Sequence, residues 1–211
     1  MTFESYQQII LNDPTALVQN GLRFVHFIGL ALGLGGATLL DLMLFRFFLR
    51  RPITPEAYSI FVSSTRVVDL GLRILWLTGL GFLVFYALTD PGKLANPKVH
   101  AKFVIVTILT LNGIFIHRAI LPVIGEQVGR SLFDGVGALR RTVFSCSAAI
   151  SVTSWYVPVA LGVFSQLNNT VPAVEILAAY ALLMVVTVVI INCVMALLVP
   201  RCKVPQLVPG E

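Results

Sequence analysis

Long apolar runs separated by short polar segments are the dominant pattern along the chain. A transmembrane helix needs about 20 mostly apolar residues, and five runs approach that length: residues 24–45, 74–88, 100–124, 143–164 and 174–199. The second run, and the uncharged stretch 103–116 within the third, are short, so we expect their polar ends to reach the interface or to be buried in protein. The pattern predicts an all-α integral membrane helical bundle of about five transmembrane helices, formed by residues 1–211 as a single domain.

The composition supports lipid rather than water as the main solvent of the chain. Hydrophobic residues make up 57% of the sequence and charged residues only 12%, whereas a soluble domain carries about 25% charged residues. The three cysteines, Cys146, Cys193 and Cys202, are too widely spaced for a metal knuckle or a disulfide framework. We therefore expect three inert thiols.

The positive charges predict the orientation of the bundle. Lys and Arg are enriched in cytoplasmic loops of membrane proteins. Ten of them follow the first, third and fifth runs: Arg46, Arg50, Arg51, Arg66, Arg118, Arg130, Arg140, Arg141, Arg201 and Lys203. Only four lie on the other side: Arg23, Lys93, Lys98 and Lys102. The bias predicts an N-terminus outside, a C-terminus in the cytoplasm and a multi-pass protein of the inner (plasma) membrane. The bilayer, not nucleic acid, is the partner that these flanking charges indicate.

Two connecting segments have apolar residues at helical spacing. Residues 55–73 predict a cytoplasmic helix that leads into the second transmembrane helix. Residues 125–141 predict an amphipathic helix on the inner interface.

The three histidines are the first candidates for chemistry. His100 and His117 stand 17 residues apart, which is about 25 Å along a helix, so they cannot bind one metal ion. His26 and His100 begin two parallel helices at a similar depth near the outer face, as two axial haem ligands in a helical bundle would. Gly29 and Gly33 follow His26 and admit either a closely packed helix or a flat macrocycle. Interfacial histidines without a ligand are the alternative.

Charges predicted near the inner face form a second candidate site. Asp69 and Arg73 are spaced i,i+4, so they can pair on one helix face, and Asp41 lies late in the first run. These charges either pin the bundle together through ion pairs or line a path for protons or cations. His117 is an interface anchor or a proton relay at the same depth. Lys102 either extends to the interface or binds a propionate or another anion.

The stretch "VHAKFVIVTILTLNGIFIH" (99–117) resembles the third helix of the HemJ-like and CopD-like membrane proteins. His26, at the start of "HFIGLALGLGG", resembles the first-helix histidine of those families. The resemblance implies b-type haem binding, with a redox role in HemJ-like members and copper handling in CopD-like members. It assigns His26, His100, Lys102 and His117 to the cofactor.

Three functions are compatible with these observations. The preferred one is a membrane protein with haem b, held by His26 and His100, that transfers electrons to a membrane redox partner or oxidises a membrane-accessible substrate, alone or as a homo-oligomer. The alternative is a transporter or permease component for a cation such as copper or a proton, with Asp41, Asp69 and Arg73 in its path. The third is a membrane subunit without a site of its own.

Overall fold

A computed structural model describes residues 13–48 and 52–198, and these residues form an all-α bundle. Its long helices are α2 (Pro14–Phe48), α3 (Pro55–Thr89), α4 (Pro97–Phe115), α6 (Ala138–Val163) and α7 (Ala173–Leu198). Five helical segments are long and apolar enough to cross a membrane. The predicted fold class and the number of transmembrane helices are therefore confirmed.

The third transmembrane segment contains a wider turn. After α4 comes a π-helical turn, η2 (Ile116–Ile120), which runs directly into α5 (Leu121–Glu126). The amide of Leu121 donates to the carbonyl of Ile116, five residues earlier. Pro122 follows at once, and because proline has no N–H and crowds the preceding turn, it disturbs the α-helical pattern at this point. His117 lies in this π turn.

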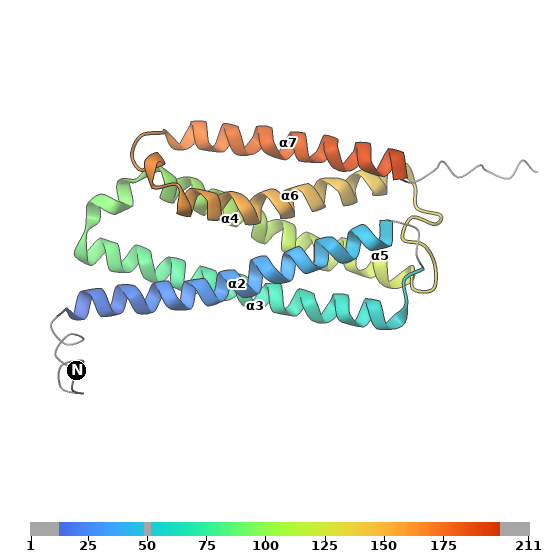
Figure 1. Ribbon diagram of the computed structural model, residues 1–211, viewed down its shortest axis with the longest axis horizontal. Coiled ribbons are helices and arrows are strands. Elements are labelled where there is room, and N and C mark those ends of the chain that lie inside the picture. Colours follow the sequence, from blue (N-terminus) through green and yellow to red (C-terminus); the bar gives the residue numbers. More distant parts are fainter. Residues whose placement is uncertain (1–12, 49–51, 199–211) are drawn as a thin grey trace, which may run out of the picture.

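The helices form two groups that run side by side (Figure 1). α2 packs along α3, whereas α4 packs against α6 and α7, and α6 also contacts α2. One end of the bundle holds the short helices η1 (Pro91–Ala95) and η3 (Ser165–Leu167); we call it the η1 end. The opposite end holds α5 and the connection 127–137; we call it the loop end.

The second transmembrane helix begins much earlier than residue 74, where the hydropathy pattern placed it. α3 begins at Pro55, where the Thr54 side chain accepts a hydrogen bond from the amide of Ala57, and continues without a break to Thr89. The predicted helix in 55–73 is therefore confirmed, and it is continuous with the transmembrane part. Polar side chains inside it interrupt the apolar run but not the helix.

Two glycine-rich helix faces allow α2 and α3 to approach backbone to backbone. A Cβ atom added at Gly71 would lie 2.6 Å from Cα of Gly33 and 2.7 Å from the carbonyl oxygen of Gly29. A Cβ atom added at Gly33 would overlap the ring of Trp155 from α6. Of the two roles open for this glycine face, the structure supports close packing, because neighbouring residues fill the space beside it.

The connection 127–137 is not the amphipathic helix that its apolar spacing predicted. Ile53 accepts a hydrogen bond from the amide of Gly129 at 2.8 Å and donates to the carbonyl of Arg130 at 3.0 Å. Gly129 and Gly135 both have positive φ values, 87° and 71°, which favour glycine and interrupt a helix. Arg141 then donates to the carbonyls of Phe133 and Val136, so this arginine holds the connection in place.

Two of the three apolar clusters that the described residues form line the interior of the bundle near α2 and α3. The loop-end cluster closes the bundle beneath the connection and comprises Phe47, Ile53, Phe61, Ile120, Ile124, Leu132, Phe133, Val136 and Phe144. The central cluster lies nearer the middle and comprises Ala37, Leu109 and Trp155, with Leu34, Val68, Leu72 and Leu75 packed around them. Polar side chains lie between the two clusters.

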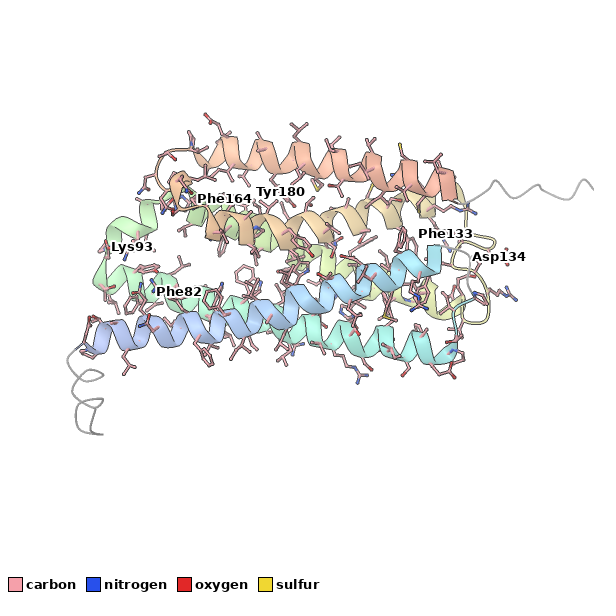
Figure 2. All side chains as sticks on the ribbon, viewed as in Figure 1. Phe82, Lys93, Phe133, Asp134, Phe164 and Tyr180 are labelled. Atoms are coloured by element: carbon pink, nitrogen blue, oxygen red, sulfur yellow. The ribbon has the colours of Figure 1, made fainter. Side chains whose placement is uncertain are left out.

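The orientation of the bundle is a prediction that thiol labelling can test. In a variant whose native cysteines are replaced, we expect Lys93→Cys at the η1 end to react with an impermeant maleimide added outside cells. Asp134→Cys at the loop end should react only after the membrane is opened, because the positive charges assign that end to the cytoplasm. Both native residues are exposed and lie at opposite ends (Figure 2). The reverse labelling pattern would invert the topology. Arg50, Arg51, Arg201, Cys202 and Lys203 lie outside the described residues.

Candidate functional site

A cavity of about 80 Å³ lies inside the bundle, between α2, α3, the α4–η2 segment and α6. The loop-end cluster contributes Phe61, Ile120 and Phe144 to its wall, and the central cluster contributes Ala37, Leu109 and Trp155. A water molecule needs about 10–15 Å³ of such space and two to four polar partners. The cavity is thus large enough for several waters if its lining supplies hydrogen bonds.

An acid and a histidine from two different helices meet at this cavity. Nε2 of His117 lies 3.0 Å from Oδ2 and 3.1 Å from Oδ1 of Asp69. Asp69 comes from the middle of α3 and His117 from the π turn η2, and both side chains are about one-third exposed, partly to the cavity. The pair joins two helices that are distant in sequence and places a carboxylate beside an imidazole, whose ring nitrogens can each donate or accept a hydrogen bond.

The expected ion pair between Asp69 and Arg73 is not formed. The side chain of Arg73 is exposed and does not line the cavity, and Asp69 is paired with His117 instead. The i,i+4 spacing allows the two side chains to meet, but this face of α3 borders the cavity at Asp69 and the outside of the bundle at Arg73. Asp69 faces inward, and Arg73 faces outward.

Asp41 is the second carboxylate of the cavity. It lies on α2, is half-buried and lines the cavity with Asp69 and His117. Among the described residues, none donates a hydrogen bond to it or pairs with it. The structure therefore brings together two of the three predicted charges and adds His117 in place of Arg73.

The remaining polar lining was not predicted from the sequence. Nδ2 of Asn112 donates to the carbonyl of Ser147 at 3.0 Å, and the Ser147 hydroxyl donates to Oδ1 of Asn112 at 2.9 Å. Both residues are buried, and Ser151 lines the cavity one turn further along α6. The sequence signal was present: Asn112 interrupts an apolar run, and Ser147 and Ser151 are one turn apart in an uncharged helix.

His26 lies outside this cavity, in the η1-end half of the bundle. Its Nδ1 is 2.7 Å from the hydroxyl of Thr78, and its ring meets the edge of Phe82 with centroids 5.7 Å apart. The Thr78 hydroxyl donates its own proton to the carbonyl of Ile74 at 2.7 Å, so its oxygen accepts from His26. Nδ1 therefore carries the proton, and Nε2 keeps a free lone pair.

Among the described residues, no hydrogen bond or ring contact joins His100 to His26. The side chain of His100 is exposed, and this residue belongs to α4, which packs against α6 and α7, whereas His26 belongs to α2, which packs along α3. The glycine face that could have held a macrocycle is filled by Ile74, Gly71 and Trp155. His26 has one ring nitrogen held by Thr78, as a histidine ligand commonly does; its pairing with His100 on a haem stays a prediction. Within 13–48 and 52–198, no group of three or more His, Cys, Asp or Glu side chains gathers as a metal site.

The fold and cavity define a multi-pass α-helical membrane protein with a mostly apolar cavity inside the bundle, into which a few polar side chains project. No protein-family model matches the chain. No curated protein and no solved structure is significantly similar to it.

Proposed function

We propose that the protein conducts protons, or another small cation, through its helical bundle. The observation that carries the proposal is the Asp69–His117 pair, which faces the same cavity as Asp41 between two apolar clusters. Ionisable groups inside a membrane bundle are costly, and they commonly mark proton relays and ion paths. From the distribution of positive charges, we also propose that the protein resides in the inner (plasma) membrane.

The lining of the cavity favours a proton over copper. Copper(I) prefers thiolate and thioether ligands, and among the described residues that line the cavity there is no Cys and no Met. The lining instead provides carboxylates, an imidazole, an amide and hydroxyls, which exchange or transmit protons through hydrogen bonds. Copper is therefore the weaker candidate for the cargo of this cavity.

The apolar clusters on both sides of the cavity indicate gated rather than continuous conduction. Hydrophobic constrictions block ions by excluding water. The central cluster, with Trp155 only 4% exposed, separates the cavity from the η1 end, and the loop-end cluster separates it from the connection 127–137. The chamber thus holds protons between two barriers that have to open for net transfer.

Proteoliposomes with an entrapped pH-sensitive dye test this function. A potassium gradient with valinomycin sets the membrane potential, and the internal pH is followed over time. We expect vesicles containing the protein to change pH faster than protein-free vesicles. Equal rates for the two, at both polarities of the potential, would contradict the proposal. Copper(I) added to the same vesicles, with a copper-sensitive dye inside, tests the alternative cargo.

The haem function stays a separate prediction with its own measurement. The free Nε2 of His26 supports this prediction, because the Thr78 hydroxyl holds the ring in one tautomer. A haem with two axial ligands also needs a second ligand, and the side chain of His100, the predicted one, is exposed. Protein produced with ample haem shows a Soret band if a haem binds. A Soret band that His26→Ala removes would restore the haem proposal, together with its membrane redox partner.

A further inference from the structure

Lys102 is a cation inside the bundle without an anionic partner. It lies in the second turn of α4 and is half-buried. Its ammonium group points at α6, where a Cβ atom added to Gly162 would lie 3.5 Å from Nζ. Among the described residues, no carboxylate pairs with Lys102 and no acceptor takes a hydrogen bond from it.

Lys98 lies one turn earlier on the same face of α4, and its ammonium group does have a hydrogen-bond acceptor. Its side chain is only 5% exposed, and its Nζ donates to the carbonyl of Phe164 at 2.7 Å. Phe164 lies at the end of α6, in the η1-end half of the bundle (Figure 2). The partial negative charge at the C-terminal end of a helix attracts cations, which explains why both lysines point here. Among the described residues, the three N–H donors of the Lys102 ammonium group nevertheless have no acceptor.

The surroundings of Lys102 add positive charge or neutral groups rather than negative charge. Lys98 and Lys102 lie close enough for their charges to repel each other. The charge of Lys102 also acts on the imidazole of His26. The loop acid Asp90 is paired with Lys93 at 3.2 Å. A group with negative charge from outside the described chain would relieve this repulsion.

We propose that Lys102, with Lys98 one turn earlier on α4, binds an oxyanion beside the C-terminal end of α6 at the η1 end. The ammonium of Lys102 supplies three donors for anionic oxygens. A phosphate group fits this combination, either as the headgroup of an anionic phospholipid with hydroxyls or as free hydrogen phosphate. The site is independent of the proton-conducting cavity, because the central cluster lies between them.

Thermal unfolding in detergent tests the site with two probes. The probes are phosphatidylglycerol against phosphatidylcholine in mixed micelles, and inorganic phosphate against chloride at equal ionic strength. A ligand that binds only the folded protein stabilises it, and we expect a rise of about 2–4 °C in the unfolding midpoint. A rise with phosphatidylglycerol alone identifies a lipid headgroup; a rise with phosphate as well identifies a free oxyanion.

Variants at position 102 separate binding from general effects. Lys102→Gln should abolish the rise, whereas Lys102→Arg and the exposed control Lys93→Gln should retain it. Without either probe, Lys102→Gln should unfold at or above the parent midpoint, because it removes an unpaired charge from the bundle. The proposal is wrong if neither probe stabilises the parent, or if Lys102→Gln responds as strongly as the parent.

Discussion

Replacing Gly71 by alanine is expected to remove most of the folded protein. The added methyl group would lie 2.6 Å from Cα of Gly33 and 2.7 Å from the carbonyl oxygen of Gly29. These are backbone atoms in the middle of a helix, so they cannot turn away as a side chain would. Overpacking a core costs about 1–3 kcal/mol, occasionally more, and here we expect the upper end of that range or beyond. The yield of monodisperse protein and the thermal midpoint in detergent measure the effect.

Gly79→Ala is the matched control on the same helix. A Cβ atom added at Gly79 meets nothing within 4 Å, and alanine favours a helix over glycine by about 0.5–1 kcal/mol. We therefore expect Gly79→Ala to unfold at or slightly above the midpoint of the parent. If Gly71→Ala and Gly79→Ala behave alike, α2 and α3 do not approach each other at Gly33 as described.

Replacing Asp41 by asparagine is expected to stop proton transfer while the protein stays folded. Asparagine has the same shape as aspartate but cannot carry and release a proton, and Asp41 lines the cavity without a partner among the described residues. Losing an acid–base group typically costs about 10²–10⁴-fold in proton-transfer steps, so we expect the vesicle rate to fall at least about tenfold. The thermal midpoint should not fall, because a charge without an ion-pair partner is removed.

Arg73→Gln is the control for this measurement. It also removes one charge from the bundle, four residues after Asp69 on α3, but Arg73 is exposed and outside the cavity lining. Its proton rate should equal that of the parent. His117→Gln should resemble Asp41→Asn in rate, since it removes the imidazole that pairs with Asp69. Parent-like rates in both Asp41→Asn and His117→Gln would show that the cavity does not carry the protons.

The helices were predictable because their signal is local. Length and hydropathy place five apolar segments, and Pro55 and Pro97 each stand near the N-terminus of a helix, where proline is favoured. The connection 127–137 was mispredicted because its conformation depends on Ile53, which lies more than 70 positions earlier and bonds to Gly129 and Arg130. A spacing pattern contains no information about such a distant partner.

The candidate site was only half predictable for a related reason. Sequence depth placed Asp41, Asp69 and His117 in the same half of the bundle, and the structure brings all three to one cavity. The direction in which each helix face points depends on tertiary packing, so the sequence did not show that Asp69 would pair with His117 rather than Arg73. The pairing of His26 with His100 rests on their matched depth and stays a prediction, while α2 and α4 have different main packing partners.

The contact between Gly33 and Gly71 lies near the middle of both α2 and α3. A change in the angle between the two helices would therefore turn them about this point. Each helix has 35 residues, so each arm on either side of the contact is about 25 Å long. A change of about 10° in the crossing angle would move each tip by about 4 Å, given that arm length. Asp41 and Asp69 lie on the loop-end side of the contact, and His26 and Thr78 lie on its other side. Because Asp41 and His26 lie on opposite sides of this contact, such a change would displace the cavity side and the His26 side of the helix pair at the same time.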